Sequence, residues 1–188
     1  MIPLNIFTTL VFYLVIALSA CTAQDPAIPL AKEYSSCCGT EHVELTFEKK
    51  QLFIPNAFIP TRDKENNFFA PYINDVITDV WGFSVYSAEG DTLLYQIPYF
   101  NSKMKIEEYG WNGLRPDGST YKGLFRYKMR IDDREANKHI VEGKACAIVC
   151  GDDAKQLQSK VSCYFPIQAG EQGKLNREKT KESVKFCL

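Results

Sequence analysis

Cys21 is the residue whose neighbours indicate the most specific chemistry in this chain. It ends the tetrapeptide Leu18-Ser19-Ala20-Cys21, in which small residues precede the thiol, and it follows an apolar run that starts at Leu10. Residues 1–20 contain no Asp, Glu, Lys or Arg. This pattern is typical of a signal peptide, and a cysteine at the cleavage point is typical of a bacterial lipoprotein precursor. We expect residues 1–20 to be removed and Cys21 to be acylated.

A membrane-spanning anchor or an ordinary secretory signal is the alternative. The uncharged stretch is near the lower edge of the roughly 17–25 residues that a spanning helix needs. The n-region, residues 1–5, has no basic side chain, which departs from a typical signal. Several acyl chains on one cysteine would give stable attachment, because each buried methylene contributes ~0.8 kcal/mol. We expect an outer-membrane lipid anchor, facing the periplasm or the outside, with residues 21–40 as its tether.

Six further cysteines could form disulfides. They are Cys37, Cys38, Cys146, Cys150, Cys163 and Cys187. Exported proteins oxidise such thiols, and an even number remains once Cys21 is assigned to lipid. Zinc is disfavoured because the sequence has no CxxC pair and only His42 and His139 could assist. We expect up to three disulfides and no metal.

Sequence patterns of hydrolases are missing. Neither Gly-x-Ser-x-Gly nor His-Glu-x-x-His occurs, and both histidines are expected at the surface. The acidic pairs Asp132-Asp133 and Asp152-Asp153 fall in expected turns, where solvated acids are commoner than a catalytic couple. The 22 basic and 23 acidic residues nearly cancel without forming a basic block. We therefore expect no catalysis, no cofactor and no nucleic-acid partner.

The elements that must position these residues are expected to be strands. Apolar and polar residues alternate in Val43–Phe47, Phe83–Tyr86 and Leu124–Ile131. Turn sequences separate these runs at Glu89-Gly90-Asp91, Asn112-Gly113 and Asp117-Gly118. The pattern predicts one antiparallel β-sandwich over residues 41–150. In the extension 151–188, Val161–Ile167 is expected to be a strand, and Asn176–Phe186 either a short helix or a solvated end.

Several segments, in order, resemble the landmarks of a known family. These are Phe53–Pro60 with Asn66–Phe69, Phe83–Tyr86 with Leu93–Tyr95, Trp111-Asn112-Gly113, Gly123–Tyr127 and Glu142–Val149. Together they resemble the gliding-motility-associated C-terminal domain, the type B sorting domain of Bacteroidetes type IX secretion. The resemblance covers roughly residues 51–150 and implies an immunoglobulin-like β-sandwich.

This fold would bring the first and last strands side by side. Cys37 or Cys38 should then bond Cys146 or Cys150, which leaves Cys163 for Cys187. The loop Thr61–Asn66 lacks the glycine of an Asp-rich calcium loop, so we expect no calcium there.

The resemblance also bears on function. Members of this family carry the domain at the end of a large cargo, whereas this chain has none, which argues against an export tag. We expect a membrane-tethered, non-catalytic binding or assembly module of the cell envelope, with an envelope protein or a glycan as partner. A type IX export role is one alternative. The other is carbohydrate binding by Trp81 and Trp111, which are also expected as core or rim aromatics.

Overall fold

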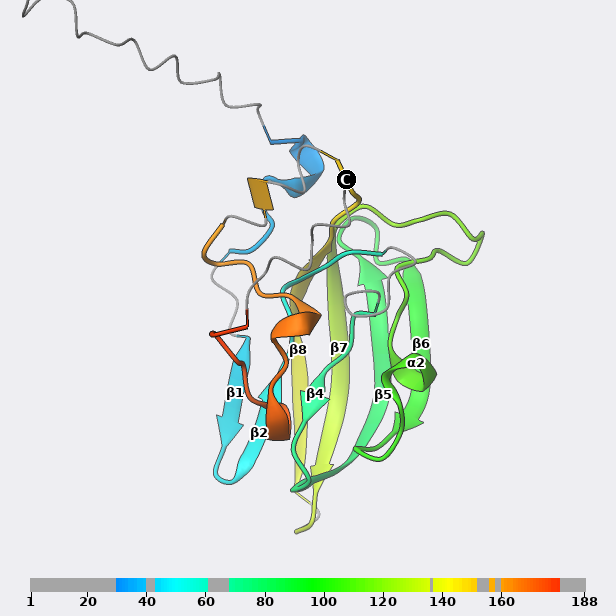
Figure 1. Ribbon diagram of the computed structural model, residues 1–188. Helices are drawn as coiled ribbons and strands as arrows, with labels where there is room; N and C mark the ends of the chain where they lie inside the picture. The colour runs from blue at the N-terminus through cyan, green and yellow to red at the C-terminus, as the bar shows by residue number, and fades with distance from the viewer. Residues whose placement is uncertain are drawn as a thin grey trace, which may run out of the picture.

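The computed structural model describes residues 30–39, 43–60, 68–135, 137–151, 156–157 and 160–179. The expected signal peptide 1–20, Cys21, His42, the loop Thr61–Asn66, Asp152-Asp153 and Cys187 lie outside these residues. The described chain is mostly β-structure, and its strands form two sheets (Figure 1).

The larger sheet has five strands in the order β3-β8-β7-β5-β6. Its strands are β3 (Ala57–Phe58), β5 (Ile77–Ser87), β6 (Leu93–Phe100), β7 (Gly123–Asp133) and β8 (Lys138–Ala147). All neighbours are antiparallel except β3, which runs parallel to β8. The alternating segments at 83–86 and 124–131 are confirmed as parts of β5 and β7. The expected closing strand starts earlier than predicted and ends at Ala147, so Cys150 lies beyond it.

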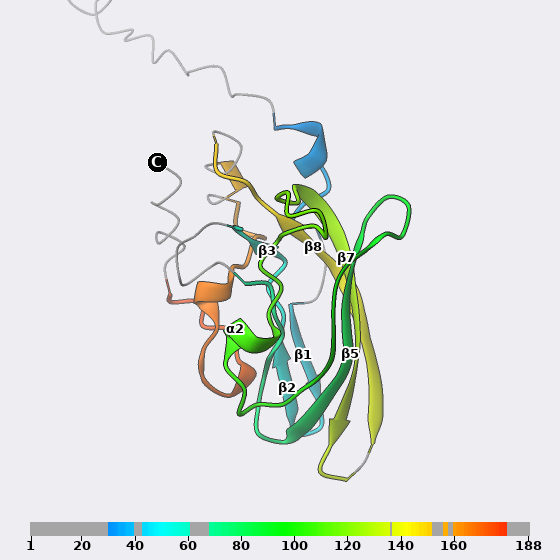
Figure 2. The ribbon, with the colours of Figure 1, turned by 90° about the vertical axis from the view of Figure 1, so that its right-hand side faces the viewer.

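The smaller sheet has three antiparallel strands in the order β1-β2-β4. They are β1 (Glu44–Phe47), β2 (Lys50–Phe53) and β4 (Tyr72–Ile73). Figure 2 shows this sheet and the C-terminal segment on one side of the larger sheet, with no further described strand or helix on the other side. We call that other side the outer face. The short elements are α2 (Ile106–Tyr109) and the 3-10 turns η2 (Lys32–Tyr34), η3 (Pro166–Gln168) and η4 (Glu171–Gly173).

An aromatic core lies between the two sheets. Leu52 of β2, Phe83 of β5 and Phe125 of β7 belong to one buried cluster. Phe69 packs edge-on against Phe125, with ring centroids 4.7 Å apart, a geometry that adds roughly 0.5–1.5 kcal/mol to burial. Gly113 has φ +81°, and a Cβ there would meet the Cβ of Pro60 at 2.4 Å. The Asn112-Gly113 turn can therefore pack closely only with glycine.

The predicted strand Val161–Ile167 is wrong. This segment forms no named strand and is held in part by one side chain: Asn56 Nδ2 donates to the Ser162 carbonyl at 2.8 Å, and its Oδ1 accepts from the Tyr164 N–H at 2.8 Å. Pro166, which has no N–H to donate, begins η3. The alternation of residue types could not reveal a partner more than 100 positions away.

Two disulfides hold the N-terminal segment on the end of the larger sheet. Cys37 bonds Cys146, with Cα atoms 5.7 Å apart, which is one of the predicted pairings. Cys38 bonds Cys163, so the predicted Cys163–Cys187 bond is wrong. The first strand does not explain the first bond, because β1 belongs to the smaller sheet and β8 pairs with β3. The segment around η2 reaches β8 instead, and a hydrogen bond of 2.8 Å from the Val149 N–H to the Tyr34 hydroxyl holds it there.

Candidate functional site

The two tryptophans lie in different surroundings. The Trp111 side chain is 1% exposed, and its Nε1 donates to the Leu114 carbonyl at 2.9 Å. Its ring packs against Phe58 and Phe125 in the core. Trp81 on β5 is 40% exposed and lies on the outer face. Only Trp81 can therefore contact a ligand from solution in this arrangement.

A row of side chains crosses the outer face at Trp81. The register places Trp81 opposite Tyr99 of β6 on one side and Arg130 of β7 on the other, and Arg130 opposite Ile140 of β8. Ile140 is 60% exposed, so its apolar side chain lies on the surface beside Arg130. We call Tyr99, Trp81, Arg130 and Ile140 the Trp81 row.

The Trp81 indole is flanked from both neighbouring strands. The Arg130 guanidinium carbon lies 5.4 Å from the indole centroid, a cation–π contact that contributes about 0.5–1 kcal/mol at an exposed site. The Tyr99 ring centroid lies 4.8 Å away, with the rings tilted by 53°. Because β6 and β7 lie on opposite sides of β5, these groups approach the indole from opposite sides. Arg130 therefore lies over one face of the indole, and Tyr99 lies beside the ring at an angle.

Hydrogen bonds fix the neighbours of Trp81 in turn. Arg130 makes a bidentate pair with Asp132, at 2.9 Å from Nε to Oδ1 and 3.2 Å from Nη2 to Oδ2. The Tyr99 hydroxyl donates to Asp79 Oδ1 at 2.8 Å and accepts from Asn101 Nδ2 at 2.8 Å. The row is thus ordered before any ligand arrives, which lowers the entropy lost on binding.

Charged side chains of both signs lie around the Trp81 row. Lys128 of β7 pairs with Glu142 of β8 at 3.7 Å, and Arg126 pairs with Asp91. These four residues line an open hollow of about 600 Å³ on the same face. Since cations and acids are interspersed, the surface has no strong preference for an anionic or a cationic ligand.

Gly82 decides which way Trp81 points. Residues two apart on a regular strand face the same side, yet Trp81 is exposed and Phe83 is buried in the core. Gly82 has φ +60°, and the pairing of β5 with β7 shifts register between Trp81 and Ser84. This irregularity turns Trp81 outward. A glycine inside an expected strand is the sequence feature that indicates such a bulge.

A buried ion pair joins the two sheets away from the outer face. Lys50 Nζ of β2 lies 2.7 Å from Asp133 Oδ2 of β7, and the side chains are 4% and 2% exposed. Asp133 also accepts the backbone N–H groups of Glu135 and Asn137 at 2.8 and 2.9 Å. The hydrogen bond from Lys50 is the largest cause that holds the Asp133 pKa well below its usual range, and the pair raises the Lys50 pKa. The expectation that Asp132-Asp133 are solvated turn acids is wrong, because Asp132 pairs with Arg130 and Asp133 is buried.

His139 is not the surface residue that we expected. Its ring stacks on Phe47 of β1 with centroids 5.1 Å apart, and its Nε2 is buried with no hydrogen-bond partner among the described residues. Within the described part of the chain, no group of three or more His, Cys, Asp or Glu side chains could hold a metal ion.

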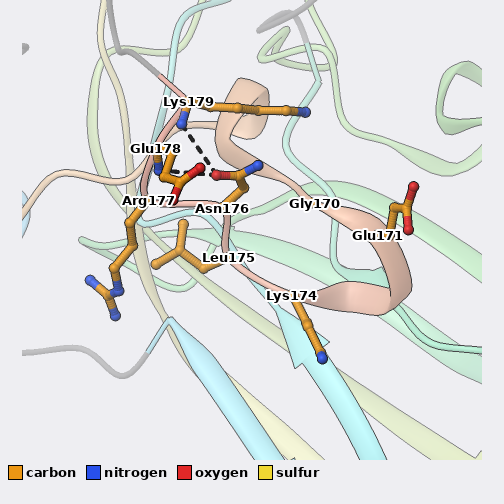
Figure 3. A pocket seen from close by; sticks show the side chains of 8 residues that line it. All are labelled: Gly170, Glu171, Lys174, Leu175, Asn176, Arg177, Glu178 and Lys179. Carbon is orange, nitrogen blue, oxygen red and sulfur yellow. Dashed lines mark hydrogen bonds between the residues drawn. The ribbon is translucent and has the colours of Figure 1, made fainter.

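A second hollow, of about 770 Å³, lies along residues 170–179. Figure 3 shows that Glu171, Lys174 and Arg177 project away from one another there. The Asn176 Oδ1 accepts the N–H groups of Glu178 and Lys179 within its own turn, at 3.0 and 3.3 Å. No set of side chains converges in this hollow, so it is a weaker candidate than the Trp81 row.

Comparisons with protein families and with curated proteins identified no relative of this chain. No protein-family model matches the chain, and the search of curated proteins found no match. Among the described residues, no helix is both long and apolar enough to cross a membrane.

Proposed function

We propose that this chain is a membrane-tethered, non-catalytic binding module of the bacterial cell envelope, and that it binds a protein partner through the Trp81 row. Cys21 would carry the lipid, residues 21–40 would form the tether, and the two sheets would form an immunoglobulin-like sandwich. The observation that carries the proposal is the ordered row of Tyr99, Trp81, Arg130 and Ile140 on a face that no described element covers.

The residue types of the row favour a protein partner. Trp, Tyr and Arg are the side chains that most often dominate binding energy at protein interfaces, where energetically neutral contacts surround them and exclude water. Trp81, Tyr99 and Arg130 lie together, and Ile140 extends their apolar surface. The ion pair Lys128–Glu142 lies next to the row, as a polar rim would.

Carbohydrate binding is less well supported. A sugar stacks on the open face of an aromatic ring, whereas Trp111 is buried and Trp81 has Tyr99 and Arg130 on its two sides. Export through type IX secretion rests on the sequence resemblance alone. A fusion of residues 41–188 to a reporter tests that alternative, because export of the reporter would replace the binding proposal.

Site-specific photo-crosslinking in cells tests the proposal. A photoreactive residue at Ile140 should give one protein adduct of defined mass, and Trp81→Ala should abolish it. Val161 is the matched control, because it is 83% exposed and lies in the C-terminal segment outside the larger sheet. Adducts at both positions, or an Ile140 adduct that glycan-cleaving enzymes remove, would contradict a protein partner at the row.

A further inference from the structure

Adjacent Cys37 and Cys38 each bond a distant segment, and this connectivity has a mechanical consequence. The two bonds span sequence separations of 109 and 125 residues. The strands β1 to β7 lie wholly within both covalent loops, and β8 lies within the larger one. All four sulfur-bearing residues are buried in one cluster with Tyr34 and Phe165.

The backbone and side chains around the bonds hold this arrangement. Cys38 has φ +54°, a left-handed conformation that is uncommon for a residue other than glycine. Lys160 Nζ donates to the Cys37 carbonyl at 2.8 Å, and the Ser162 hydroxyl donates to the Cys38 carbonyl at 2.7 Å. Residues 37–38 of the N-terminal segment and residues 160–163 of the C-terminal segment therefore lie together in the fold.

We propose that these two disulfides are a covalent route for tension that by-passes the sheets. A pull between the N-terminal segment and the C-terminal segment runs from Cys38 directly to Cys163, so no strand is loaded. A pull on the outer face reaches the N-terminal segment through Cys146 of β8 and Cys37, not through β1 of the smaller sheet. The biological use of this route rests on the proposed tether, but the route itself does not.

The two bonds act in parallel, so loss of one bond should change the measured extension and loss of the other should not. Either bond alone keeps the strands β1 to β7 out of the tension path. Without Cys38–Cys163, the path runs from Cys37 to Cys146 and then along the 17 residues to Cys163 (163 minus 146). At about 3.5 Å per extended residue, this adds about 60 Å of extension. Without Cys37–Cys146, the direct path from Cys38 to Cys163 is unchanged.

Single-molecule force spectroscopy on the mature chain tests the route, with Cys21→Ser for attachment of an N-terminal handle and a second handle at the C-terminus. Cys150 is disulfide-bonded as well, so every variant also carries Cys150→Ser and Cys187→Ser. The oxidised protein should show no long unfolding step. Cys38→Ser with Cys163→Ser should gain about 60 Å, and Cys37→Ser with Cys146→Ser should gain none.

Addition of a reductant to the same oxidised molecules should release the 125-residue loop, a gain of about 440 Å at the same length per residue. This comparison needs no variant that must fold without both bonds. A step of about 440 Å in the oxidised protein, or equal extensions in the two paired variants, would overturn the proposal. Neither result would bear on whether the Trp81 row binds a partner.

Discussion

Lys50 Nζ and Asp133 Oδ2 lie 2.7 Å apart and tie the smaller sheet to the larger one. The Asp133 carboxylate also holds the turn after β7, because it accepts three hydrogen bonds from that turn. Loss of one charge should leave the other buried without its partner, which destabilises a fold more than loss of both. Lys50→Met should therefore lower the free energy of unfolding more than Lys50→Met combined with Asp133→Asn. The exposed pair Arg134–Asp75 is the control, where Asp75→Asn should change little.

The same pair predicts how stability depends on pH. The Asp133 pKa is depressed in the folded state, so its contribution is present above the unfolded value of about 3.9 and is lost as pH falls toward the folded value. The Lys50 pKa is raised, so its contribution is present below about 10.4 and is lost as pH rises through the folded value. The stability difference between wild type and Asp133→Asn should be flat between these limits and shrink outside them. A difference that peaks or vanishes near neutral pH would contradict the assignment.

Position 82 should require glycine because of its backbone conformation, and not because a larger side chain would clash with its neighbours. A Cβ there would meet no atom within 4 Å, but φ is +60°. Gly82→Ala should therefore cost about 1–2 kcal/mol in thermal or denaturant unfolding, and Gly82→Asn should cost less because asparagine tolerates this region. Gly151 also has open space around it and no positive φ, so Gly151→Ala is the matched control. Equal effects at the two glycines would mean that the bulge does not constrain β5.

Some features of the fold and of the Trp81 row could be predicted from the sequence, and others could not. Local patterns predicted β1, most of β7 and the turns, because alternation and turn residues act over a few positions. The sequence left the surroundings of Trp81 open between a core, a rim and a binding position, because Gly82 interrupts the alternation on β5. Tyr99, Arg130 and Ile140 joined the site only through strand register, which the residue types do not specify.

Long-range partners account for the other errors. Asp133 looked like a solvated turn acid because its partner Lys50 lies more than 80 positions earlier. The segment 161–167 was expected to be a strand because its hydrogen-bond partner Asn56 lies more than 100 positions earlier and could not be identified from the local pattern. Cys163 was assigned to Cys187 because the path of the segment around η2 could not be inferred without the fold.

The remaining cysteines give a further prediction. Cys150 forms a disulfide, and the four cysteines of the two described bonds are already paired. With Cys21 assigned to lipid, we predict that Cys150 bonds Cys187. Non-reducing peptide mapping should join the peptides that contain these two residues, and removal of the bond should cost about 2–5 kcal/mol. A free thiol at Cys187 would contradict this pairing.

The proposed tether depends on one residue, Cys21. Cys21→Ala should move the protein from the membrane to the soluble fraction, or leave the precursor uncleaved, because no other residue could place lipid at the mature N-terminus. Cell fractionation and mass spectrometry of the N-terminal peptide measure this. Ser19→Ala is a suitable control, since it keeps a small residue before the cysteine. A cleaved, unacylated N-terminus with unchanged fractionation would show that the anchor is not lipid.

The affinity of the Trp81 row for its partner is the most direct test of the whole account. Once crosslinking at Ile140 has identified the partner, its Kd should be measured for the wild type, Trp81→Ala and Val161→Ser. Trp81→Ala should weaken binding by roughly 30-fold or more, which corresponds to the 2 kcal/mol expected for a central interface residue. Val161→Ser should leave the Kd unchanged. Equal affinities for the wild type and a folded Trp81→Ala variant would contradict the claim that this row is the binding surface.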